Sequence, residues 1–136
     1  MADFPLSENF DWVRARAECS IAHVYKQLYN DVIRDVEVVK SLLPTDMQVK
    51  FTVTNGKGSF SVVREICGLI PDSVNFSIYR NESITAQDDD NTFQFTATLT
   101  LNNEGKCRLK VGDLELCLWQ FRRMALEKLF FVLRRT

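Results

Sequence analysis

The chain has little of the glycine and proline that flexible linkers need, and only one histidine for acid–base chemistry. Five Gly, three Pro and one His occur among its 136 residues. Scarce Gly and Pro exclude collagen-like and linker-rich architectures, and a lone His argues against many acid–base schemes. Seventeen Lys+Arg against eighteen Asp+Glu give a net charge of −1, so no overall field attracts nucleic acid. The length predicts a single domain, 1–136.

Long hydrophobic runs and closely spaced cysteines are also missing. No window approaches the roughly 18–20 uninterrupted apolar residues of a membrane span. The first positions carry acidic residues where a signal peptide would be basic. The cysteines form no C-x-x-C pair: they are Cys19, Cys67, Cys107 and Cys117. We therefore expect a cytoplasmic protein with four reduced thiols.

Motifs of catalysis, cofactor binding or metal binding do not occur either. The chain lacks G-x-S-x-G, H-E-x-x-H, the dinucleotide fingerprint and the Walker sequence. The glycine-rich stretch 55–58 precedes a predicted strand rather than a helix, so it predicts a hairpin turn instead of a phosphate loop. The acidic run 88–91 lacks the alternation and closing Glu of a calcium loop, and predicts a solvated turn. We expect no enzyme activity, cofactor or metal.

Helical periodicity marks the first part of the chain, residues 8–43, which Pro44 terminates. Ser20 has the chemistry to cap a second helix. The apolar stripe nevertheless stays in phase across Ser20, so we expect one continuous helix, with a break near Ser20 as the alternative. The stripe comprises Phe10, Val13, Ala17, Ile21, Val24, Leu28, Val32, Val39 and Leu42.

Alternation with a period of two marks residues 47–117. In the clearest strand, Phe93, Phe95 and Ala97 alternate with Gln94 and Thr96. Connections as short as those in this region force neighbouring strands to be antiparallel. We predict a six- to seven-stranded meander with one solvent-facing side.

Residues 118–134 again have helical periodicity, and a sheet with one apolar face must bury that face. The fold class is therefore predicted as α+β: an antiparallel meander flanked by a long N-terminal helix and a C-terminal helix. The pleckstrin-homology order and the helix-grip order are two similar known topologies. Such analogies at the level of the fold carry no function.

Several side chains depart from these patterns and are candidate site residues. Asp35 and Arg122 both fall within apolar stripes, so we predict an ion pair between them; the alternative is that each reaches solvent separately. Cys19 and His23, four residues apart, could bind a metal together with Cys107 and Cys117, or form a thiol–base pair. With a single His, we favour an exposed helix face that carries a small thiol and a solvated imidazole.

Two surfaces are candidates for binding. Apolar or aromatic groups on polar helix faces predict a partner surface of Trp12, His23, Met124 and Phe131. Basic residues of the last helix predict an anion contact, although a solvated basic face is the common alternative: Arg123, Lys128, Arg134 and Arg135.

These features favour a small non-enzymatic protein-interaction module, with a homodimer through the long first helix as one form. One alternative is a carrier of an apolar or anionic small ligand. Its apolar cavity would be lined by Phe51, Phe76, Phe93, Phe95 and Trp119. Another alternative is an enzyme without a recognisable motif.

Overall fold

The computed structural model describes residues 9–44 and 48–132, and it confirms the predicted α+β arrangement. Two helices come first, α1 (Trp12–Glu18) and α2 (Ile21–Leu42). Seven strands follow: β1 (Val49–Asn55), β2 (Ser59–Ile66), β3 (Asp72–Tyr79), β4 (Ser83–Asp88), β5 (Gln94–Leu101), β6 (Cys107–Val111) and β7 (Leu114–Leu116). The last element is α3 (Leu118–Phe131).

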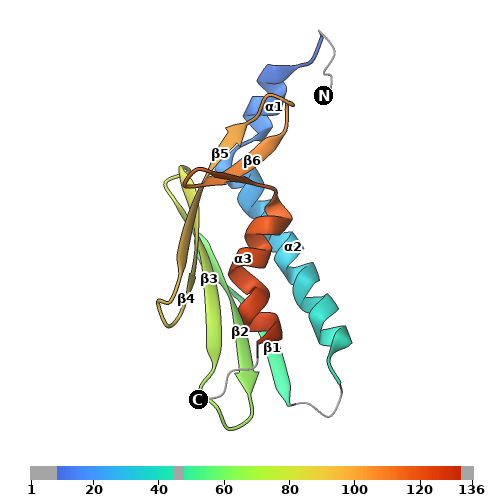
Figure 1. The fold of residues 1–136 in the computed structure, drawn as a ribbon, viewed down its shortest axis with the longest axis vertical. Coiled ribbons are helices and arrows are strands. Elements are labelled where there is room, and N and C mark those ends of the chain that lie inside the picture. The colour runs from blue at the N-terminus through green and yellow to red at the C-terminus, as the bar shows by residue number, and fades with distance from the viewer. Residues whose placement is uncertain (1–8, 45–47, 133–136) are drawn as a thin grey trace.

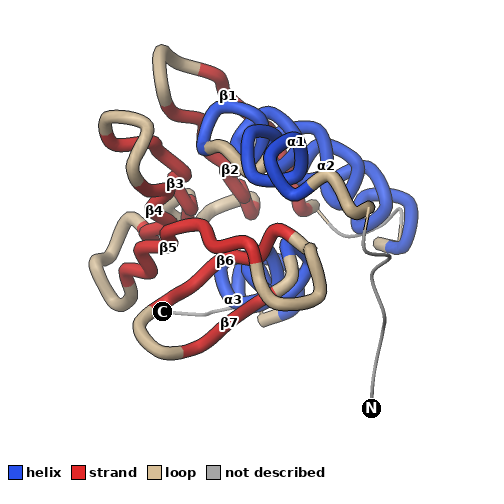
Figure 2. The backbone as a smooth tube through the Cα atoms, turned by 90° about the horizontal axis from the view of Figure 1, so that it is seen from above, coloured by secondary structure: helices blue, strands red, loops and turns tan. Residues whose placement is uncertain are grey.

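The strands form one antiparallel meander in which spatial order equals sequence order, β1 to β7. Tight turns set the register. Between β1 and β2, Asn55 pairs with Phe60 around a turn in which Gly58 has a φ of +71°. Between β3 and β4, Arg80 and Asn81 both take positive φ, and the Glu82 N–H donates to the Tyr79 carbonyl at 2.8 Å to close the turn. The sheet curls, with α2 and α3 on its inner side (Figures 1 and 2).

The core lies between the inner face of the sheet and these two helices. Leu28 and Val32 of α2 are completely buried, as is Phe121 of α3. Phe76 of β3 stacks on Phe60 of β2, with 4.9 Å between the ring centroids, and lies 6.3 Å from the ring of Phe121. The apolar alternation of the strands and the helical stripes thus bury the same cluster.

The predicted continuous helix is wrong: the helix is interrupted at Cys19 and Ser20, between α1 and α2. Ser20 has extended backbone angles (φ −120°, ψ 153°), and its hydroxyl accepts a hydrogen bond from the His23 N–H at 3.2 Å. This local cap outweighs the apolar phase, because α1 has no core to pack against and buries none of its residues. The predicted stripe is therefore buried only between Ile21 and Val39; at its two ends Val13 is 59% and Leu42 69% exposed.

The prediction of four reduced thiols is also wrong, because Cys19 and Cys107 form a disulfide. Their Cα atoms lie 5.4 Å apart although the residues are 88 positions apart in the chain. Cys19 is 2% exposed rather than on a solvent-facing helix surface, because the helix break turns it toward β6. Cys67 and Cys117 are free thiols.

No helix in the described ranges is both long enough and apolar enough to cross a membrane.

Candidate functional site

An apolar groove runs between α2 and α3, which lie side by side (Figure 1). Its volume is about 380 Å³. Val39, Leu126 and Phe130 form a buried base. Large apolar side chains that solvent still reaches surround this base: Val38 (52% exposed), Leu42 (69%), Trp119 (53%) and Phe131 (67%). We call these seven residues the α2–α3 groove. Exposed apolar groups that gather in one place mark contact surfaces, whereas scattered ones do not.

The predicted partners Asp35 and Arg122 lie beside one another at this groove. Arg122 Nε donates to Asp35 Oδ2 at 2.7 Å, and its Nη1 donates to Asp31 Oδ2 at 3.2 Å. Asp31 was missed in the sequence, although its place one helical turn before Asp35 puts it on the same face. Arg34 also hydrogen-bonds Asp31, which raises the pKa of Arg34.

Charges around the groove are balanced rather than of one sign. Arg122 faces Asp35, and Arg123 Nε donates to Glu127 Oε1 at 3.0 Å one turn along α3. All four of these residues line the groove. The rim therefore produces little net field, and the surface that it frames is selective for apolar shape rather than for charge.

The structure does not gather the four residues of the predicted partner surface. Phe131 lies at the groove, but Met124 is half-buried against the core. Trp12 is 63% exposed on α1, and His23 is exposed near the start of α2. A helical-wheel argument found Phe131 because it is large and off the core stripe. It missed Leu42, which belongs to the predicted apolar stripe, and Trp119, which was expected to line a ligand cavity.

The predicted anion contact is divided between two places. Arg123 is paired with Glu127 at the α2–α3 groove. Lys128 lines a different cavity, together with the carboxylates Asp72, Asp88, Asp89 and Asp90. Arg134 and Arg135 lie outside the described residues. The two described basic residues therefore do not converge on one anion.

That second cavity, of about 300 Å³, contains a buried arginine that sequence reasoning missed. Arg64 is 3% exposed. Its Nη1 donates to the carbonyl oxygens of Leu129 at 2.8 Å and Val132 at 2.7 Å, and its Nη2 donates to Asp72 Oδ2 at 2.6 Å. Arg64 thereby satisfies carbonyls at the end of α3 that have no partner within the helix. The signal was present, since Arg64 continues the inward phase of Phe60 and Val62.

Carboxylates cluster beside Arg64. Carboxylate oxygens of Asp72, Asp89 and Asp90 lie within 4.8 Å of one another. Asp88 has a structural task, because it accepts hydrogen bonds from the N–H groups of Thr92 at 2.8 Å and Phe93 at 3.1 Å. Burial raises the pKa of Asp88, but these bonds, with one from the Thr92 hydroxyl, outweigh burial and lower the pKa overall. The cluster is part of the β4–β5 turn and its surroundings.

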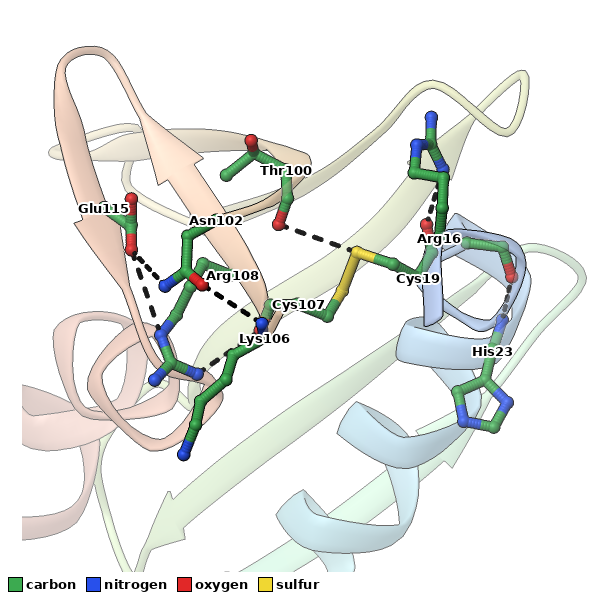
Figure 3. The surroundings of a disulfide bond; sticks show 10 residues. Arg16, Cys19, His23, Thr100, Asn102, Lys106, Cys107, Arg108 and Glu115 are labelled. Atoms are coloured by element: carbon green, nitrogen blue, oxygen red, sulfur yellow. Dashed lines mark hydrogen bonds and ion pairs between the residues drawn. A yellow bond between two sulfur atoms is a disulfide. The ribbon is translucent and has the colours of Figure 1, made fainter. Parts of the chain in front are cut away.

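The cysteines and the histidine are not gathered into a metal site. Within the described residues, the one cluster of three metal-ligating side chains is the aspartate cluster above. Figure 3 shows the Cys19 and Cys107 sulfur atoms bonded to each other, with His23 pointing away from them. The alternative of a thiol–base pair between Cys19 and His23 does not apply, since Cys19 holds no free thiol. The exposed thiol that we favoured at Cys19 is wrong for the same reason.

The aromatic residues predicted to line a ligand cavity do not surround one space. Phe51 and Phe76 are 3% and 0% exposed and pack against Phe130 and Phe60 respectively, whereas Trp119 is half-exposed on α3. Phe93 and Phe95 stack on each other with 4.9 Å between centroids. The chain matches no known family, no curated protein and no solved structure.

Proposed function

We propose that this protein is a non-enzymatic interaction module that binds another protein chain through the α2–α3 groove. One observation carries the proposal: Val38, Leu42, Trp119 and Phe131 keep half or more of their surface exposed around one recess. Removing apolar surface from water contributes roughly 25 cal/mol per Å², so a partner that covers these side chains gains directly. No cofactor or nucleic acid is part of this function.

The occupant that we propose is the same groove of a second copy. A two-fold dimer brings a surface against itself, so that surface must be self-complementary. We expect the groove to meet this requirement, because it combines a recess with apolar side chains, Leu42 and Phe131, that are 69% and 67% exposed. Its rim carries both signs of charge, already paired within one copy as Arg123 with Glu127, so two copies approach without net repulsion.

Tryptophan fluorescence can measure whether the α2–α3 groove becomes covered. The two tryptophans of the chain are Trp12 on α1 and Trp119 at the groove. In a Trp12→Phe variant, Trp119 is the sole emitter. We expect its emission maximum to move to shorter wavelength as the protein concentration rises, while sedimentation velocity shows the mass of a dimer.

Substitutions at the groove test whether this surface makes the contact. Leu42→Asp or Phe131→Asp places a charge in the interface and should weaken association by at least about thirtyfold, or roughly 2 kcal/mol. Val13→Asp is the control, since Val13 is also apolar and 59% exposed but lies on α1. A protein that stays monomeric to about 200 µM with constant Trp119 emission would refute the proposed dimer.

We also propose a cytoplasmic location. An exposed free thiol at Cys67 suits a reducing compartment. The Cys19–Cys107 disulfide then has to be one that forms and breaks under cellular conditions.

A further inference from the structure

The Cys19–Cys107 bond fastens the junction of two helices to the sheet. Cys19 is the residue at which α1 ends, directly before the cap of α2, and Cys107 is the first residue of β6 (Figure 3). Both sulfur atoms come from segments that are remote in sequence, 88 positions apart. The bond is the one disulfide among the described residues.

Helix α1 depends on this bond for its position. None of its seven residues, Trp12–Glu18, is buried, and Trp12 and Val13 are 63% and 59% exposed. Its described polar contacts are local: the Asp11 side chain caps the Arg14 N–H, and Arg16 Nη1 donates to the Cys19 carbonyl at 3.1 Å. An isolated helix of this length is unstable in water. The covalent link therefore takes the place of the packing that α1 lacks.

The surroundings of the two sulfur atoms suit exchange with an external thiol. Cys107 is partly exposed whereas Cys19 is 2% exposed, so an incoming thiolate meets Cys107 Sγ first. Cys19 then leaves as a thiolate. It directly precedes the N-terminus of a 22-residue helix, and the Arg16 side chain reaches its carbonyl group. The partial positive charge of a helix N-terminus stabilises a departing thiolate.

The reduced form also finds a partner in place. Cys19 Sγ lies 3.7 Å from the Thr100 carbonyl oxygen. In the disulfide, Cys19 Sγ carries no hydrogen, so it cannot donate a hydrogen bond to this carbonyl. After the bond breaks and the Cys19 thiolate takes up a proton, the new S–H can donate to that carbonyl. A cavity of about 400 Å³ beside Cys19, lined in part by Arg16, Asn81 and Thr98, gives the released side chain room.

We propose that Cys19–Cys107 is a reversible thiol–disulfide exchange site whose reduction by a dithiol releases α1 from the sheet. One thiolate of the dithiol attacks Cys107 Sγ, the S–S bond breaks, and Cys19 leaves and is protonated. The second thiol of the reductant then attacks the mixed disulfide and frees Cys107 as a thiol. Two electrons and two protons pass to the protein, and the reductant becomes a cyclic disulfide.

Alkylation and limited proteolysis test the proposal with dithiothreitol as the dithiol. Air-oxidised native protein should take up alkylating reagent at Cys67 and Cys117 alone; after dithiothreitol without denaturant it should take up reagent at all four cysteines. Reduction should also raise the rate of tryptic cleavage after Arg14 and Arg16 by about tenfold, since α1 opens more often. Cleavage after Lys50 in β1 is the internal control and should not change.

Two variants separate the bond from the thiols themselves. Cys107→Ser should be cleaved in α1 at the fast rate with or without dithiothreitol, and Cys67→Ser should respond as the natural sequence does. If Cys107→Ser fails to fold, the comparison of oxidised and reduced natural protein decides alone. The proposal is overturned if air oxidation leaves four alkylatable thiols, if native protein resists dithiothreitol, or if both forms are cleaved in α1 at one rate.

Discussion

Replacement of Arg64 by methionine tests whether one buried guanidinium holds the end of α3 to the sheet. Methionine keeps the approximate length and the apolar stem but removes every hydrogen-bond donor. Three acceptors then lose their partner: the carbonyls of Leu129 and Val132 and the carboxylate of Asp72, now bonded at 2.8, 2.7 and 2.6 Å. The perturbation is local, because Arg64 is 3% exposed.

The expected loss follows from what remains buried. Removing one partner of a buried charge pair destabilises a protein by about 3–5 kcal/mol. Asp72 is 26% exposed, so water can hydrate it in part, and the Leu129 carbonyl lies in the interior. We therefore expect the lower end of that range, about 3 kcal/mol. The double variant Arg64→Met/Asp72→Asn should recover about 1 kcal/mol, because the orphaned charge is gone.

Urea unfolding followed by far-ultraviolet circular dichroism measures this loss. With a slope of about 2 kcal/mol per molar urea, the midpoint should fall by about 1.5 M. Arg108→Met is the matched control: its pair with Glu115 is 4.0 Å long and partly exposed, so the expected loss is below about 1 kcal/mol. A loss below about 1 kcal/mol for Arg64→Met would refute the view that Arg64 fastens α3.

Two further predictions concern carboxylates. Asp35→Asn and Arg122→Met should each lower stability, and the double variant should lose about 1 kcal/mol less than their sum, measured by a double-mutant cycle in urea; additive losses would contradict a pair. The lowered pKa of Asp88 means that its contribution is present above the pKa of the unfolded chain and is lost as pH falls through the lower pKa of the folded protein. Asp88→Asn should therefore flatten the acid limb of the stability curve, and an unchanged limb would disprove this role.

Local patterns were sufficient for most of the architecture. The alternation in 47–117 and the turn residues between strands predicted the meander, because a one-residue shift would place every apolar side chain on the wrong face. The helix break was harder to foresee. Hydrophobic phase favoured continuity and Ser20 favoured a cap, and only the lack of a partner for α1 decided between them.

The candidate site was predictable only in part. Asp35 and Arg122 stood out because a charge in an apolar stripe needs a partner. Arg122 Nε lies 2.7 Å from Asp35 Oδ2. Leu42 was placed in the apolar stripe and Trp119 in a ligand cavity, because a helical wheel shows which residues share a face but not where the covering layer ends. Their exposure follows from the sheet, which reaches the inner sides of α2 and α3 but not the seam between them.

By itself, the sequence determined the strands, the last helix and the antiparallel pairing, because periodicity and short turns act over a few residues. Tertiary structure alone decided three features: the bond between Cys19 and Cys107, the hydrogen bonds of Arg64 to the end of α3, and the α2–α3 groove. Each of these joins segments dozens of residues apart. Their meeting depends on how the curled sheet and the helices pack together, which no local pattern encodes.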